Sequence, residues 1–83
     1  MTAREAILAL LSERKAGQTI CPSEAARLLA ETDEAWRAKM PKVHRAVDAM
    51  LADGVIVLTW KGDRKERRLG AYRIRAASPS RSQ

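Results

Sequence analysis

The chain has 83 residues, of which 46% are hydrophobic and 31% charged, and its net charge is +6. This length allows one domain, and this composition excludes an intrinsically disordered chain. One cysteine excludes an internal disulfide and a cysteine-based zinc site, and no apolar run approaches the roughly 20 residues of a membrane helix. We therefore expect a reduced, cytoplasmic protein without a signal peptide or a membrane contact.

The charge is unevenly distributed. Residues 1–36 carry four Lys and Arg against six Asp and Glu, whereas residues 37–83 carry twelve against four, so the net charges are −2 and +8. A polyanion-binding face requires such a basic region, although many small basic domains bind no nucleic acid.

The first expected element is a helix from Thr2 to about Lys15. Thr2 and Glu5 have the spacing of a capping box, and Gly17 is suited to end the helix. Apolar residues at helical spacing form its core stripe: Ala3, Ala6, Ile7, Leu10 and Leu11.

Residues 19–21 are predicted to add a short edge strand to a sheet. Pro22 is suited to the first position of a second helix, which ends near Ala30. Its inward face is predicted to hold Ala25, Leu28 and Leu29.

An acidic connection over residues 31–34 and a short turn through Trp36, which we expect to pack on the core, lead to a third helix. Pro41 marks its start, because the residue before a proline disfavours the helical region, and Asp53 marks its end. The predicted core stripe consists of Val43, Ala46, Val47, Met50 and Leu51.

Two alternating runs, residues 55–60 and 69–75, predict a β-hairpin. The predicted register pairs apolar side chains across it: Leu58 with Tyr72, and Ile56 with Ile74. Residues 61–68 then form an unpaired loop, and residues 76–83 a disordered tail. Arg73 and Arg75 alternate outward on the last strand, where they extend the basic patch or act as edge-strand charges.

This order of elements predicts an α+β fold of the winged helix-turn-helix type over residues 1–75: three helices, a short strand and a C-terminal two-stranded β-hairpin wing. In that arrangement the third helix enters the major groove of DNA and the hairpin loop contacts the backbone or the minor groove.

The candidate DNA-binding residues are the basic side chains of the third helix and of the loop. Arg45 is suited to read guanine, Lys42 to hold a phosphate or a base acceptor, and Asp48 and Asp53 would repel phosphate. The pattern favours a nucleic-acid face, and the alternatives are a solvated helix face and a loop kept soluble by its charge. The full candidate set is Lys39, Lys42, His44, Arg45, Lys61, Arg64, Lys65, Arg67 and Arg68.

The sequence favours no enzyme. Cys21 and His44 lie in different predicted elements without a supporting motif, so we expect Cys21 to be a buried structural residue. We find no phosphate-binding glycine loop or metal-ligand cluster, and expect neither a cofactor nor a metal. Trp60, at a strand end, is consistent with covering the core or with resting on a sugar–phosphate.

Two segments carry a resemblance to a known family. The run Ile20-Cys21-Pro22-Ser23-Glu24 with Ala26, and Trp36-Arg37 followed by Met40-Pro41 and Val43, resemble small bacterial proteins grouped as domain of unknown function 3253. So do Gly54, Ile56, Lys61-Gly62, and Gly70 followed by Arg73 and Arg75, so the similarity spans about residues 3–75. The family often has proline where this chain has Ala71. The resemblance implies a winged-helix-like fold and brings no established activity.

The sequence thus predicts a DNA-binding protein, such as a small transcriptional regulator, that contacts duplex DNA with residues 41–53 and 61–68. The alternative is a protein-interaction or dimerisation module without nucleic-acid binding. The alanine-bearing face of the third helix would then pack on a second copy or on another protein, and the basic charge would steer an acidic partner.

Overall fold

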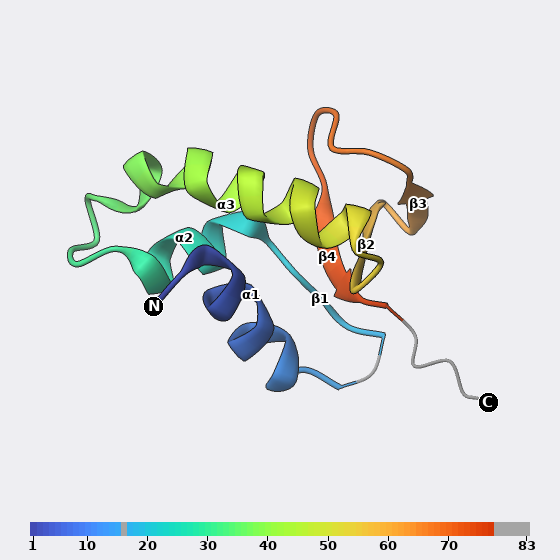
Figure 1. The fold of residues 1–83 in the computed structure, drawn as a ribbon, viewed down its shortest axis with the longest axis horizontal. Coiled ribbons are helices and arrows are strands. Elements are labelled where there is room, and N and C mark those ends of the chain that lie inside the picture. Colours follow the sequence, from blue (N-terminus) through green and yellow to red (C-terminus); the bar gives the residue numbers. More distant parts are fainter. Residues whose placement is uncertain (16, 78–83) are drawn as a thin grey trace.

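Three helices and a four-stranded antiparallel sheet form an α+β fold in the computed structural model, which describes residues 1–15 and 17–77 (Figure 1). The α+β class predicted from the sequence is confirmed, but the sheet has four strands and not a short strand plus a two-stranded hairpin. In chain order the elements are α1 (Ala3–Ser12), β1 (Thr19–Ile20), α2 (Pro22–Leu29), α3 (Trp36–Ala52), β2 (Ile56–Trp60), β3 (Asp63–Lys65) and β4 (Arg73–Ala76).

The first two helices begin where the sequence predicts. Thr2 and Glu5 form the capping box of α1, and Pro22 occupies the first turn of α2. The helix α1 ends at Ser12, three residues before the predicted end. In α2 the buried residues are Pro22, Ala25 and Ala26, whereas Leu28, predicted to face inward, is 44% exposed.

The third helix begins at Trp36, five residues before Pro41, so the predicted start at that proline is wrong. A proline inside a helix removes one backbone hydrogen bond and crowds the carbonyl four residues earlier. The first turn of α3 is compensated by packing, because Trp36 and Met40 lie against the hydrophobic core. The predicted core stripe is confirmed: Val43, Val47 and Met50 are buried, and Ala46 and Leu51 are partly buried.

The predicted loop 61–68 is not unpaired. Its residues 63–65 form β3, which pairs with β2 through a turn at Lys61 and Gly62. Both turn residues have positive φ, 53° and 86°, as a two-residue type I′ hairpin turn requires. The chain then passes from β3 at the sheet edge to β4 on the other side of β2, because the strand order is β1-β4-β2-β3.

The hairpin register differs from the predicted one by two residues. Leu58 lies opposite Ile74, and Ile56 lies opposite Ala76. A shift of two residues preserves which face each side chain occupies, so Ile74 is fully buried as expected. The strand β4 lies between β1 and β2 and is not an edge strand, and it extends one residue past the predicted boundary at 75. The predicted tail lies, from residue 78 on, outside the described residues.

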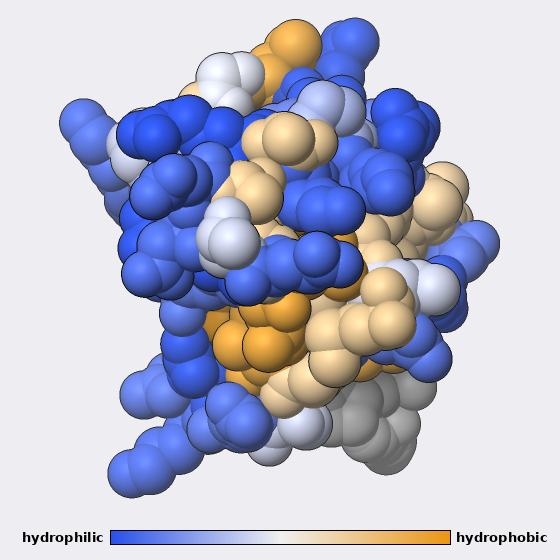
Figure 2. All heavy atoms as spheres, turned by 90° about the vertical axis from the view of Figure 1, so that its left-hand side faces the viewer, coloured by the Kyte–Doolittle hydropathy of each residue, from blue (hydrophilic) through white to orange (hydrophobic). Residues whose placement is uncertain are grey.

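One face of the sheet packs on the helices. Ile20, Ile56, Leu58 and Ile74 belong to the same buried cluster as the apolar faces of α1, α2 and α3. The side of the molecule that carries the N-terminus is mostly hydrophilic around an apolar area (Figure 2). Among the described residues, no helix combines the length and the apolar character that crossing a membrane requires.

We predict that Ile74→Ala lowers the free energy of unfolding by about 2–5 kcal/mol, because it leaves a cavity where β4 meets both neighbouring strands. Leu69, which is 62% exposed, provides the control, and Leu69→Ala should change stability by less than about 0.5 kcal/mol. Urea unfolding followed by circular dichroism measures both values. Equal effects of the two substitutions would contradict the burial of Ile74 between β1 and β2.

Candidate nucleic-acid interface

The exposed side of α3 carries basic and small side chains. Lys42, Arg45, Ala49 and Ala52 are exposed, as the sequence predicts. Residues three apart on a helix are neighbours on its surface, so Lys42, Arg45 and Asp48 follow one another along the same side. The short side chains of Ala49 and Ala52 leave the backbone of the C-terminal half accessible on this side.

Both carboxylates that would repel a polyanion from α3 are bound by arginines from other elements. Arg68 donates two hydrogen bonds to Asp48, at 2.9 and 3.0 Å, and Arg4 of α1 donates one to Asp53 at 3.2 Å. The hydrogen bond from Arg68 holds the pKa of Asp48 below its usual value, so this carboxylate stays ionised and paired at neutral pH. The sequence alone indicated two repulsive charges here; the structure shows both of them partnered.

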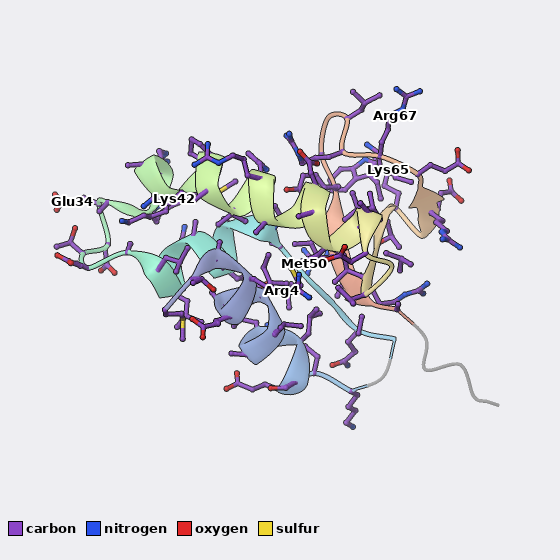
Figure 3. The ribbon with its side chains drawn as sticks, viewed as in Figure 1. Arg4, Glu34, Lys42, Met50, Lys65 and Arg67 are labelled. Atoms are coloured by element: carbon purple, nitrogen blue, oxygen red, sulfur yellow. The ribbon has the colours of Figure 1, made fainter. Side chains whose placement is uncertain are left out.

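The loop of residues 66–72 is fixed beside α3. Arg68 anchors it to Asp48, and the ammonium group of Lys65 donates to the backbone carbonyls of Leu69 and Ala71, the latter at 3.0 Å. Lys65 and Arg67 lie above the C-terminal half of α3, whereas Lys42 lies on its N-terminal half (Figure 3). Arg67 is exposed. Two of the predicted phosphate contacts, Lys65 and Arg68, are therefore engaged in holding the loop.

His44, a further candidate, lies half-buried between α3 and the sheet. Its Nδ1 shares a hydrogen bond of 2.7 Å with the Tyr72 hydroxyl. Burial, and next the nearby Arg68, lower the pKa of His44, and burial raises the pKa of Tyr72 to about 12. Both groups are therefore neutral at pH 7, and they add a second tie between α3 and the residues that precede β4.

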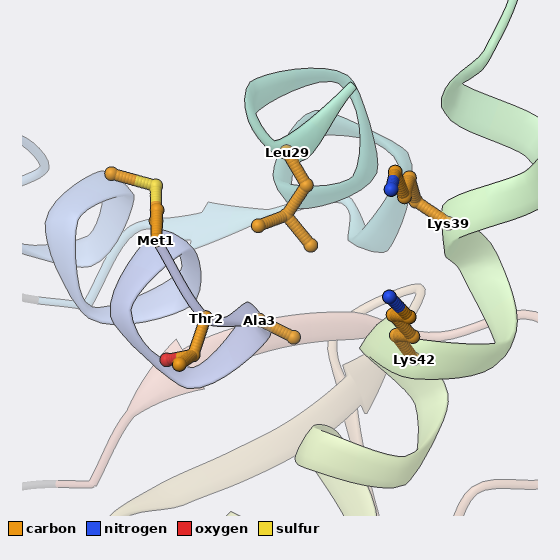
Figure 4. A pocket seen from close by; sticks show the side chains of 6 residues that line it. All are labelled: Met1, Thr2, Ala3, Leu29, Lys39 and Lys42. Atoms are coloured by element: carbon orange, nitrogen blue, oxygen red, sulfur yellow. The ribbon is translucent and has the colours of Figure 1, made fainter. Parts of the chain in front are cut away.

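Lys39 and Lys42 border a hollow of about 330 Å³ between α3, the end of α2 and the start of α1. Their ammonium groups point into it, towards Leu29 and the first residues of the chain (Figure 4). Lys39 is partly buried there, whereas Lys42 is exposed. These two lysines thus occupy the flank of α3 away from the loop.

The remaining candidates lie elsewhere on the hairpin. Lys61 is exposed in the turn between β2 and β3. Arg64 pairs with Thr59 on the sheet face opposite to the buried Leu58. The structure therefore divides the predicted basic loop among the turn, the outer sheet face, the loop anchors and the exposed Arg67.

Trp36 has a feature that the sequence reasoning missed. It packs against the core as predicted, but the guanidinium groups of Arg27 and Arg37 also lie over its ring, at 4.8 and 4.6 Å from the centroid. The i, i+1 spacing of Trp36 and Arg37 gives no signal for such a contact.

Cys21 is half-buried at the start of α2 and accepts a hydrogen bond from Ser23. Within residues 1–15 and 17–77, no three potential metal ligands come together.

We predict that stability falls as the pH is lowered from about 7.5 to about 5. The pKa of His44 in the folded chain lies below the ordinary value of 6.5, so the unfolded chain binds more protons near that pH, and the free energy of unfolding rises with pH in this window. His44→Gln, which removes the chain's one histidine, should flatten this dependence. Urea unfolding at a series of pH values measures it, and an unchanged slope in the variant would contradict the prediction.

Comparison with known proteins gives a family and no activity. A search of curated proteins finds no match. A family model described as "Protein of unknown function (DUF3253)" matches residues 1–77, which is nearly the whole chain and includes every helix and strand. This confirms the family that the sequence resembles: the chain belongs to the DUF3253 family.

Proposed function

We propose that this protein binds duplex DNA as a winged helix-turn-helix domain. In this proposal α2 and α3 are the helix-turn-helix, α3 enters the major groove, and the loop 66–72 is the part of the wing that contacts DNA. The order of elements supports it, since α1, β1, α2 and α3 are followed by strands whose connection lies beside the end of α3.

The observation that carries the proposal is the pairing of the acidic groups on α3. Lys42 and Arg45 precede Asp48 at steps of three residues, and Asp48 is covered by Arg68 of the loop. Among the described residues, no ion pair engages Lys42, Arg45 or Arg67. A track of positive charge thus runs from Lys42 and Arg45 on α3 to the loop, and the one carboxylate between them on this side of α3, Asp48, is paired with Arg68.

Each group has a role in this proposal. Arg45 lies at the centre of the exposed side and is suited to a bidentate contact with guanine. Lys42 and Lys39 on one flank, and Arg67 on the other, would bind phosphates. Arg68 and Lys65 act as positioning residues, because their donors are occupied within the protein. His44 makes no base contact through Nδ1, which faces Tyr72.

We expect fluorescence anisotropy to detect binding of the protein to labelled random duplex DNA, and the affinity to fall steeply with salt. If three cations contact phosphates, raising the salt from about 50 to about 200 mM should weaken binding roughly fortyfold. Absence of binding at the lower salt concentration would overturn the proposal and favour a protein-interaction module.

A pair of matched double variants tests which surface binds. Lys42→Gln with Arg45→Gln should weaken binding to DNA and reduce the salt dependence, because it removes one phosphate contact and one base contact. Arg64→Gln with Arg75→Gln removes the same charge from the outer face of the sheet and should have a smaller effect on affinity. Anisotropy titrations at two salt concentrations compare the variants, and equal losses would contradict the assignment of the interface to α3.

A further inference from the structure

The outer face of the sheet is a second basic surface, separate from α3. Antiparallel pairing places opposed residues on the same face, and Ile20, Ile74 and Leu58 occupy the face buried against the helices. On each strand, the residues next to these buried ones therefore point away from the helices. The paired outward positions are Thr19, Val57, Thr59, Arg64, Arg73 and Arg75.

The paired outward positions carry three positive charges and no negative one. Arg73 and Arg64 flank Thr59 in one row, and Arg75 lies between Thr19 and Val57 in the next. Asp63 of β3 has the opposite orientation, since it pairs with Trp60. Within the described part of the chain, no ion pair engages any of these arginines.

Part of this surface is preorganised for binding by hydrogen bonds within the protein. Arg73 donates to the hydroxyl of Thr19 at 2.7 Å and to its carbonyl at 3.4 Å, so its guanidinium is fixed over β1. Val57 is 9% exposed although no helix covers this face, which indicates that neighbouring side chains cover it. The loop 66–72 cannot serve as this cover, because Lys65, which holds it, points to the inner side of the sheet.

The spacing and chemistry of this face select its partner. Arg73 and Arg75 are two residues apart on one strand, so their Cα atoms are separated by about 6.8 Å along it. Alternate residues of another extended chain have the same spacing. Guanidinium groups bind carboxylates bidentately. None of the outward positions is aromatic, whereas surfaces for single-stranded nucleic acids stack bases on aromatic rings.

We propose that the outer face of the sheet, formed by Arg64, Arg73 and Arg75, docks an extended acidic segment of a partner protein with carboxylates at alternate residues. The docking does not depend on DNA binding, because the α3 track and the sheet face share no residue. It assigns a protein partner to three arginines that α3 and the loop do not use.

A short fluorescein-labelled peptide that alternates Glu with Thr tests the proposal, with Gln replacing Glu in the control peptide. The acidic peptide should bind in a salt-dependent manner, and the control should not. Arg64→Gln with Arg75→Gln should weaken binding about tenfold, since two ion pairs are lost. Lys42→Gln with Arg45→Gln removes equal charge from α3 and should leave binding within about twofold.

Two further measurements make the outcome decisive. Thermal unfolding verifies that each variant folds, and Arg73→Lys, which retains the charge but not the planar fork, should weaken peptide binding about threefold. Equal losses in the two double variants would show general charge attraction and overturn the proposal, as would absence of binding to the acidic peptide. If single-stranded DNA displaces the peptide and its own binding requires Arg64 and Arg75, the face binds nucleic acid and the assigned partner is wrong.

Discussion

The position of β4 between β1 and β2 determines most of the structure. Ile74 lies opposite Ile20 on one side and Leu58 on the other, so one residue joins both halves of the buried sheet face. Because β3 lies at the far side of β2, the chain must cross from one side of β2 to the other before β4 begins. This crossing brings residues 66–72 beside α3, where Arg68 meets Asp48. The strand order therefore sets the site as well as the core.

The ion pairs on α3 affect the distribution of charge more than stability. The Asp48 side chain is 50% exposed and the Asp53 side chain 58% exposed, and exposed pairs of this kind contribute about 0–1 kcal/mol. Their consequence is that two negative charges on the helix are neutralised by arginines from α1 and from the loop. The electrostatic potential along the exposed side of α3 is then set by Lys42 and Arg45. A count of charged residues in the sequence does not show this.

The sequence predicts local features well, and its errors have physical causes. The capping box of Thr2 and Glu5 and the start at Pro22 depend on neighbouring residues, and both are correct. The start of α3 is wrong because packing of Trp36 on the core compensates for Pro41. Such compensation between distant residues has no signature in a local pattern.

The hairpin shows the same limit. Alternation fixes which face a strand residue occupies, but a shift of two residues leaves that pattern unchanged, so the pairing of Leu58 with Ile74 could not be chosen over Tyr72. The predicted register leaves Lys61 and Gly62 in a charged loop, and the turn there has no clear sequence signal because lysine seldom adopts a positive φ. The anchoring of Arg68 to Asp48 joins residues twenty apart in sequence and needs the fold to be found.

A run of charge in the sequence is not a charged surface in the fold. Arg64 and Lys65 are adjacent, yet in β3 they point to opposite faces of the sheet, Arg64 outward and Lys65 towards the loop carbonyls. Strand alternation therefore separates one basic cluster into two, and β4 repeats the division by placing Arg73 and Arg75 outward around the buried Ile74. Charged residues that are adjacent on one strand therefore point to opposite faces of the sheet and cannot bind one ligand on a single face. A single polyanion bound along α3 would leave the outer face of the sheet free for a different acidic partner.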